Sequence, residues 1–242
     1  MQISIRNIDK SYKNKRVLNN FSLDIDCKSG KISGFVGPNG AGKTTILKVV
    51  ADILGYDKGS IAVEGCSGNA VNNFENWSKE NISFISASER GFHLKNSVFD
   101  NVVYFGALKG SNISNVKKNF YKYAKKLDFE NFKDRELETL STGERKKAAI
   151  LCGICSETQI IILDEPTNGL DLDAVVELQE TIRKVADNLN VTFLISSHDI
   201  DFLSSIANEY FFVFNGECVK KLDESMEIES IKQLYFKLRG EG

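Results

Sequence analysis

The sequence of 242 residues contains only two prolines. It also contains no continuous run of about 18 apolar residues. A helix that crosses a membrane needs about 20 such residues, so we expect no transmembrane segment. Residues 1–6 alternate apolar and polar side chains as a strand does, and they lack the apolar core of a signal peptide. We therefore expect a cytoplasmic protein unless a partner anchors it elsewhere.

The five cysteines are an odd, scattered set, which argues against a disulfide framework and indicates a reducing compartment. Cys152 and Cys155 form a C-x-x-C pair within an apolar helical run, and no second pair completes a four-ligand metal site. We interpret both as buried, small hydrophobic side chains. The net charge of −2 gives no basic surface overall, so nucleic acid is not an expected partner.

The first proline, Pro38, belongs to a candidate phosphate-binding loop. Residues 37–44 read Gly-Pro-Asn-Gly-Ala-Gly-Lys-Thr, which is the spacing G-x-x-x-x-G-K-[ST], between an apolar strand predicted for 31–36 and a helix predicted for 44–54. We expect the glycines to adopt positive φ, so that backbone N–H groups approach an anion at the start of the helix. The residues expected to bind a nucleoside triphosphate here are Gly37, Asn39, Gly40, Ala41, Gly42, Lys43, Thr44 and Thr45.

Within this loop, each polar side chain has an expected task. Lys43 places a charge between the β- and γ-phosphates, and the Thr44 hydroxyl suits Mg²⁺. Thr45 can donate to an oxygen of the α-phosphate. The sequence therefore predicts a nucleotide site that uses Mg²⁺.

The second proline, Pro166, follows two carboxylates at the end of a continuous apolar run, 160–163. Such a run is typical of a strand buried on both faces of a parallel sheet, and ligands bind beyond the carboxyl ends of such strands. We expect Asp164 to hold the Mg²⁺ shell and Glu165 to accept or orient a proton of attacking water. A helix N-cap before Pro166 is the structural alternative. His198 follows the next buried strand, at 191–195, and can contact the γ-phosphate from the same edge.

The remaining patterns indicate an α/β chain. Further strands are predicted at 2–8, 17–26, 59–65 and 82–86, and a hairpin at 210–214 and 217–221 around Asn215-Gly216. Helical patterns cover 98–134, 142–155, 175–189 and 224–239. Tyr12 lies in a polar segment between the first two strands.

The order of these motifs resembles the ATP-binding subunit, or nucleotide-binding domain, of ABC transporters over residues 2–220. Residues 37–44 match the Walker A loop, and 160–165 match Walker B with its catalytic glutamate. Residues 140–144, Leu-Ser-Thr-Gly-Glu, match the signature motif, usually Leu-Ser-Gly-Gly-Gln. Residues 168–171 resemble the D-loop, His198 is similar to the switch histidine, and Tyr12 to the aromatic that stacks on adenine.

This resemblance implies a P-loop NTPase (RecA-like) core with a mostly parallel sheet, an N-terminal antiparallel β subdomain and an inserted α-helical subdomain. We expect a single domain over 1–242. Its core and β subdomain take about 1–87 and 157–222, the helical subdomain with the signature takes about 88–156, and a C-terminal helix takes about 223–242.

The resemblance also implies that two such domains pair head to tail, as a homo- or heterodimer, with ATP between one phosphate loop and the partner's signature. The residues that join nucleotide binding in this way are Ser141, Thr142, Gly143, Glu144 and the D-loop residue Asp171. Ser141 and Glu144 also fit a capping box, and both interpretations can hold. A membrane permease is the implied partner, which would keep the chain on the inner face of the cell membrane. The 88–92 stretch is most similar to ABC-2 exporter subunits, which favours export.

The sequence departs from the family pattern in two places. The signature has Thr142 in place of glycine and Glu144 in place of glutamine. No glutamine follows the strand at 82–86; Ser88 or Glu89 falls nearest, and Glu89 can reach a metal through water. Slow hydrolysis, or transfer of this role to another residue, is therefore an alternative, as are an ATP-dependent scaffold and a soluble ATPase uncoupled from transport.

A short apolar stretch follows this loop and has two interpretations. It consists of Phe92, His93 and Leu94, with Phe99 nearby. The stretch is either the dock for the permease or part of the helical subdomain's own core.

Overall fold

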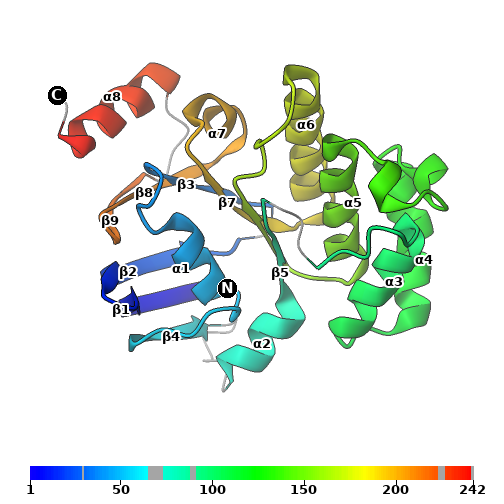
Figure 1. The fold of residues 1–242 in the computed structure, drawn as a ribbon, viewed down its shortest axis with the longest axis horizontal. Coiled ribbons are helices and arrows are strands. Elements are labelled where there is room, and N and C mark those ends of the chain that lie inside the picture. The colour runs from blue at the N-terminus through cyan, green and yellow to red at the C-terminus, as the bar shows by residue number, and fades with distance from the viewer. Residues whose placement is uncertain (29, 65–72, 88–90, 223–226, 241–242) are drawn as a thin grey trace.

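Two sheets organise the chain, and Figure 1 shows one across the middle of the molecule and the other, with β1, β2 and β4, at the lower left. The computed structural model describes residues 1–28, 30–64, 73–87, 91–222 and 227–240. The first sheet is antiparallel, in the order β2 (Lys15–Asp26), β1 (Gln2–Tyr12), β4 (Lys58–Glu64). The second has the order β5 (Ile82–Ile85), β6 (Ile160–Asp164), β7 (Thr192–Ser197), β3 (Ile32–Val36), β8 (Glu209–Phe214), β9 (Glu217–Leu222). Its pairs are parallel except β8 with β9, so the expected mostly parallel sheet beside an antiparallel β subdomain is confirmed.

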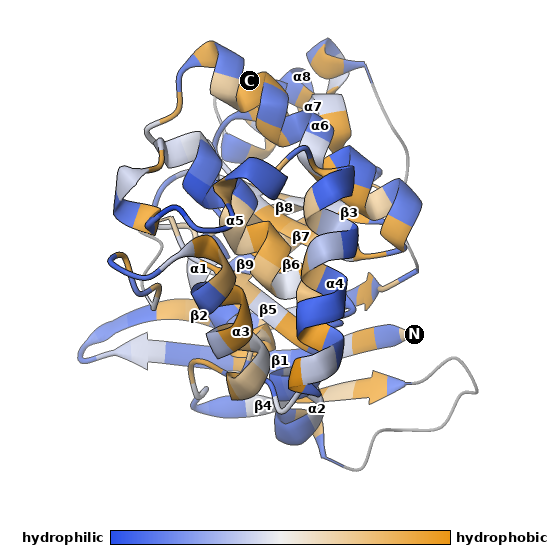
Figure 2. Cartoon of the chain, turned by 90° about the vertical axis from the view of Figure 1, so that its right-hand side faces the viewer, coloured by the Kyte–Doolittle hydropathy of each residue, from blue (hydrophilic) through white to orange (hydrophobic). Residues whose placement is uncertain are grey.

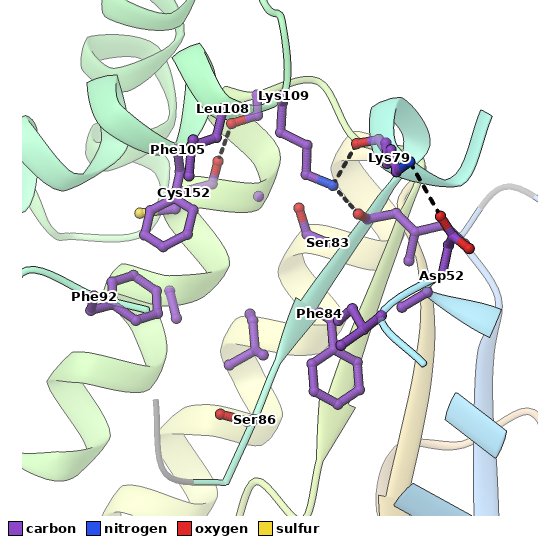
Figure 3. Close-up of a pocket in the computed structure, with 17 residues that line it drawn as sticks. Asp52, Lys79, Ser83, Phe84, Ser86, Phe92, Phe105, Leu108, Lys109 and Cys152 are labelled. Atoms are coloured by element: carbon purple, nitrogen blue, oxygen red, sulfur yellow. Dashed lines mark hydrogen bonds and ion pairs between the residues drawn. The ribbon is translucent and has the colours of Figure 1, made fainter. Parts of the chain in front are cut away.

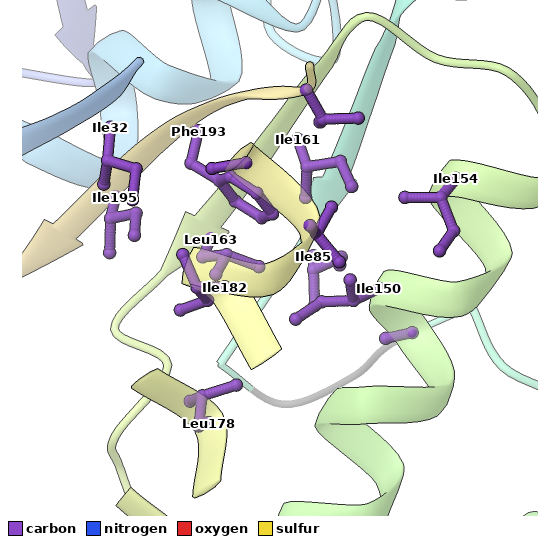
Figure 4. Packing of buried hydrophobic residues seen from close by; sticks show 14 of the residues in the cluster. Ile32, Ile85, Ile150, Ile154, Ile161, Leu163, Leu178, Ile182, Phe193 and Ile195 are labelled. Carbon is purple, nitrogen blue, oxygen red and sulfur yellow. The ribbon is translucent and has the colours of Figure 1, made fainter. Parts of the chain in front are cut away.

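Strand β6 is buried on both faces, and its alternate side chains enter two different cores. Ile160 and Ile162 point to the core shared with α1 (Lys43–Val50) and the antiparallel sheet. Ile161 and Leu163 point to the other core, where Figure 4 shows them beside Ile150, Ile182 and their neighbours. These residues come from helices α5 (Thr142–Cys155) and α6 (Leu172–Leu189). Helices α1 and α5 therefore cover opposite faces of the large sheet.

The segment between β5 and β6 forms the inserted helical subdomain. It contains α3 (Val98–Leu108), α4 (Ile113–Lys126), two 3₁₀ turns (Glu130–Phe132 and Leu137–Thr139) and α5. The helical pattern predicted for 98–134 is thus two helices, separated where Gly110 takes φ 72° and Asn112 caps α4. The subdomain extends from one side of the sheet, and α4 lies on its outer surface (Figures 1 and 2).

Several boundaries differ from the predicted ones for local reasons. Helix α1 ends at Val50 rather than at 54, because Asp52 adopts φ 54° and turns the chain. Strand β1 extends to Tyr12, which pairs with Lys15 across a hairpin, so Tyr12 ends a strand and does not lie in a loop. Two helices were not predicted, α2 (Phe74–Asn81) and α7 (Ile200–Ile206). The first is mostly polar and the second has only seven residues, so neither has a strong apolar period.

The end of the described chain forms the predicted hairpin and helix. Asn215 and Gly216 have φ 50° and 80°, as a two-residue type I′ turn requires. Helix α8 (Ile228–Arg239) follows, and the ring of Tyr235 lies 5.5 Å from that of Phe214 on β8. Among all the helices within the described ranges, none is both long and apolar enough to cross a membrane.

Cys152 and Cys155 are buried in α5, as predicted. Burial raises the pKa of both thiols, and it raises the pKa of the buried Cys27 thiol to about 12. These thiols therefore stay protonated near neutral pH and pack as small hydrophobic groups.

Candidate active site

The phosphate loop connects β3 to α1, and its glycines serve two different purposes. Gly40 and Gly42 have φ 81° and 108°, so the expectation of positive φ is confirmed for them. It is wrong for Gly37, which does not adopt positive φ. A Cβ at Gly37 would lie 2.1 Å from the carbonyl oxygen of Val213, so this glycine is required by the close approach of β8.

The loop forms one wall of a cavity of about 210 Å³. The lining residues are Val17, Pro38, Asn39, Gly40, Ala41, Gly42, Lys43, Thr44, Thr45 and Glu165. The structure thus brings the predicted loop residues from Asn39 to Thr45 together with Glu165, which lies more than a hundred residues further along the chain.

Lys43 is 5% exposed, and its ammonium group lies over the loop. Its Nζ donates to the carbonyl oxygens of Gly37 at 2.6 Å and Pro38 at 3.3 Å. Glu165 Oε1 lies 3.3 Å from the same nitrogen. An anion that enters the cavity meets this ammonium group, the loop N–H groups and the N-terminus of α1.

Asp164 and Thr44 bring two oxygen ligands side by side at the end of β6. Thr44 Oγ1 donates to Asp164 Oδ1 at 2.6 Å, although the two residues are far apart in sequence. Ser196 Oγ on β7 donates to the same oxygen at 2.7 Å, and its register partner across the sheet is Asp164. A carboxylate and a hydroxyl in contact are hard ligands, so this donor set fits Mg²⁺.

Ser196 is a residue of the site that the sequence analysis did not single out. Its signal is a polar residue directly after the apolar run Phe193–Ile195, one position before the carboxyl end of β7. The pairing of β6 with β7 makes it a neighbour of Asp164, and that pairing is not a local property of either strand.

Glu165 turns out of β6 with φ 46°, a left-handed conformation that non-glycine residues adopt rarely. Its N–H donates to the backbone oxygen of Ser196 at 3.0 Å, which fixes this turn. The structure does not support the N-cap alternative for the carboxylate pair. No helix begins at Pro166; the next one, α6, begins at Leu172 and is capped by Asp171.

His198 contacts Glu165 through both its backbone and its ring. The backbone N–H donates to Glu165 Oε2 at 3.3 Å, and Nδ1 lies 2.8 Å from the same oxygen. A proton on Nδ1 makes the ring contact a hydrogen bond. Glu165 therefore lies between Lys43 and His198, at the mouth of the cavity.

The signature segment lies on the other face of the sheet, at the N-terminus of α5. Ser141 Oγ accepts from the N–H of Glu144 at 3.1 Å, and Ser141 N–H donates to Glu144 Oε2 at 2.7 Å, so the capping box is present. A Cβ on Gly143 would lie 3.1 Å from Cβ of Ala174 on α6. Within one chain, the signature therefore packs against the segment after the D-loop and not against the phosphate loop.

Four further predicted residues lie outside the cavity or outside the described chain. Tyr12 ends β1 with 46% of its surface exposed, and it does not belong to the cavity lining. Thr142 Oγ1 accepts from the guanidinium of Arg145 at 3.2 Å. Ser88 and Glu89, the candidates for the position of the family's glutamine, fall outside the described residues.

The apolar residues that follow Glu89 in the sequence lie in two different places, because Phe92 lines a cavity and Phe99 packs in a core. The ring of Phe92 lies 4.7 Å from that of Phe105, and both line a cavity of about 300 Å³ beside β5 (Figure 3). Phe99 instead packs its ring 5.0 Å from Phe120 in the subdomain interior. Lys109 Nζ enters the cavity rim and donates to the carbonyl oxygen of Lys79 at 2.8 Å, and burial lowers the pKa of Lys109 to about 8.

Comparisons with known proteins agree with this geometry. The family model described as "ABC transporter" matches residues 18–168. The petrobactin import ATP-binding protein YclP of Bacillus subtilis is 30% identical over 96% of this chain and 92% of its own. The lantibiotic transport ATP-binding protein SrtF of Streptococcus pyogenes is 29% identical over 98% and 99%. The crystal structure of an ABC transporter's ATP-binding cassette in its ADP conformation has a TM-score of 0.83 at 20% identity, over the full length of both chains.

Proposed function

The chain belongs to the ABC transporter family, and we propose that it is the subunit that binds and hydrolyses ATP to drive a separate membrane permease. The observation that carries this proposal is the convergence of Lys43, Thr44 and Glu165 on one cavity, with Asp164 hydrogen-bonded to Thr44 behind its wall. A loop that binds phosphate, a hard-oxygen pair and a carboxylate at the cavity are the parts that phosphoryl transfer to water needs.

In this proposal each residue acts on the triphosphate or on the water that attacks it. The loop N–H groups and Lys43 bind the phosphates, and Thr44 and Asp164 hold Mg²⁺, which neutralises charge on the phosphate oxygens. Glu165 orients the attacking water and accepts its proton, since its turned-out backbone aims the carboxylate into the cavity mouth. His198 keeps Glu165 in this orientation and faces the γ-phosphate.

Cassettes of this family dimerise, and we infer that Ser141, Thr142, Gly143, Glu144 and Asp171 act on the ATP of a partner cassette. Two features support this. Ser141 and Asp171 cap neighbouring helices, so the positive ends of α5 and α6 lie side by side, where an anionic phosphate is stabilised. Both caps are exposed within one chain. In this proposal, Tyr12 stacks on the adenine of the ATP bound to its own chain, and Glu89 supports the metal there through water.

The permease docks near Phe92 in this proposal, which keeps the chain on the inner face of the cell membrane. The cavity beside β5 supports it, because Phe92 and Phe105 present apolar surface between the core and the helical subdomain (Figure 3). Export is the proposed direction, and its basis is the sequence of 88–92. Relatives at similar identity are named for import and for lantibiotic transport, so transport assays with the cognate permease decide the direction.

The test replaces Glu165 with glutamine, which keeps the shape and removes the proton acceptor. We expect Glu165→Gln to abolish ATP turnover and to accumulate ATP-dependent dimers in size-exclusion chromatography. Lys43→Ala should instead lose nucleotide binding. Glu180→Gln, the same change at an exposed position of α6, is the matched control and should keep wild-type turnover. Unchanged turnover in Glu165→Gln would contradict the role assigned to this carboxylate.

The alternative of an ATP-dependent scaffold is suggested by Thr142 in the signature and by the absence of a glutamine after the strand at 82–86. The same assay separates it from the main proposal. A scaffold binds ATP and dimerises with no turnover in the wild-type chain, whereas we expect weak but measurable turnover that Glu165→Gln removes.

A further inference from the structure

Helix α4 carries five lysines and no acidic residue. They are Lys117, Lys118, Lys122, Lys125 and Lys126, and all five are exposed. The whole chain has a net charge of −2, so the positive charge of this helix contrasts with the slightly negative charge of the protein.

The spacing places the lysines on one face. At about 100° per residue, positions 117, 118, 122, 125 and 126 fall within roughly half of the helix circumference. The other half holds Val116, Phe120 and Ala124, which are buried against the rest of the subdomain. In Figure 2 the outer side of α4 is largely hydrophilic and faces away from the sheets. We call this surface the lysine face of α4.

An aromatic residue lies in the middle of the lysine face. Tyr121 is 56% exposed, and its ring centroid lies 5.7 Å from that of Phe120 and 6.0 Å from that of Phe99. Lys133, from the 3₁₀ segment that follows, places its Nζ 5.3 Å from the Tyr121 ring centroid and adds a sixth cation at the edge. The buried Phe120 and the partly buried Phe99 hold the tyrosine ring outward among ammonium groups.

The lysine face has no internal neutralisation across the described part of the chain. None of the five ammonium groups forms an ion pair with a described carboxylate. On the buried side of the helix, Asn119 Nδ2 donates to Glu157 Oε1 at 3.1 Å. The field of the lysines is therefore directed to the outside of the molecule.

We propose that the lysine face of α4 is a contact surface for an anionic phospholipid membrane. Exposed lysines attract anionic headgroups without directed hydrogen bonds, and a tyrosine ring is suited to the depth of the headgroup layer. The face contains no arginine, the residue that binds the phosphates of nucleic acid in a bidentate way. A membrane is also within reach of a cassette that works with a permease.

The test measures binding of the purified full-length chain to sedimented vesicles of phosphatidylcholine, with and without about one-third phosphatidylserine. We expect binding only to the anionic vesicles, and loss of binding when salt rises from about 0.1 to about 1 M and the Debye length falls from about 10 to about 3 Å. Each lysine near such a surface raises the partition coefficient by a factor of about 5. The triple variant Lys118→Gln, Lys122→Gln and Lys125→Gln should therefore lower this coefficient about 100-fold.

The matched control neutralises three exposed lysines on other surfaces, Lys58→Gln, Lys184→Gln and Lys220→Gln. It changes the net charge equally and should reduce vesicle binding only a few-fold. Circular dichroism and ATP binding check that both variants are folded, and the measurement does not depend on ATP turnover. Equal loss in the two triple variants, or equal binding to neutral and anionic vesicles, would overturn the proposal. Binding to single-stranded RNA with no binding to anionic vesicles would overturn it as well.

Discussion

Replacement of Gly37 by alanine tests how closely β8 and the phosphate loop approach each other. The added Cβ would lie 2.1 Å from the carbonyl oxygen of Val213, whereas real Cβ atoms essentially never come within 3.0 Å of another heavy atom. The loop and β8 must therefore separate by about 0.9 Å. Both contacting groups belong to the backbone, so no side-chain rotation can relieve the overlap.

The cost follows from what this separation disturbs. Val36, next to Gly37, pairs with Phe212 in the parallel ladder of β3 and β8, and both strands are buried. Overpacking in a close-packed interior costs about 1–3 kcal/mol, and a backbone clash belongs at the upper end. For a chain of this size, about 3 kcal/mol lowers the melting temperature by about 6–12 °C. The displaced loop should also weaken ATP binding.

The assay is thermal unfolding of Gly37→Ala, followed by circular dichroism, together with titration of a fluorescent ATP analogue. Gly55→Ala is the steric control, because its Cβ meets nothing within 4 Å and its φ is not positive. Gly40→Ala also has open space but φ 81°, so it should cost only the about 1–2 kcal/mol of a left-handed alanine. If Gly37→Ala has the same melting temperature as Gly55→Ala, the inferred close approach of β8 to the loop is wrong.

Three further variants probe the catalytic edge and the cavity beside β5. His198→Ala should keep ATP binding and lower turnover at least about 100-fold, measured by phosphate release, because Glu165 loses its orienting contact. Ser196→Ala removes a donor to buried Asp164, so the free energy of unfolding in denaturant should fall by about 1–3 kcal/mol. Because burial lowers the pKa of Lys109 from 10.5 to about 8, the unfolded chain binds more protons between these values, and this group makes stability rise with pH there. Lys109→Met should lack that rise in melting curves from pH 8 to pH 10, and an unchanged slope would contradict the assignment.

The parts of the fold that the sequence predicts are those with a local signature. The continuous apolar run before Asp164 is a strand whose alternate residues enter two cores, which is why no polar position interrupts it. The Asn215-Gly216 pair predicts its hairpin because both residues tolerate positive φ. Helix α2 lacks such a signature because few apolar positions follow its cap, Asn73, whereas α7 has apolar residues after its cap, Asp199, but is only seven residues long.

The parts of the site that the sequence does not predict depend on contacts between distant segments. Gly37 and Gly40 are both glycines of one loop. Position 37, however, must be glycine because of a strand that begins more than 170 residues later. Ser196 becomes a partner of Asp164 only through the pairing of β6 with β7. Spacing motifs identify residues that touch a ligand, whereas residues that hold those ligand contacts in place are identified by the sheet.

The packing of Gly143 against Ala174 links the two segments proposed to act on a partner cassette. Cβ of Ala174 would be 3.1 Å from a Cβ at position 143, so the first turns of α5 and α6 are in direct contact. Ser141 caps one of these helices and Asp171 caps the other, so the two capped N-termini lie next to each other. A movement that separates α5 from α6 would have to break this contact, and residues 165–171 join α6 to the strand that ends in Asp164. This contact connects the signature to the catalytic edge through α6, although α5 packs on one face of the sheet and Asp164 lies at the carboxyl end of its strand.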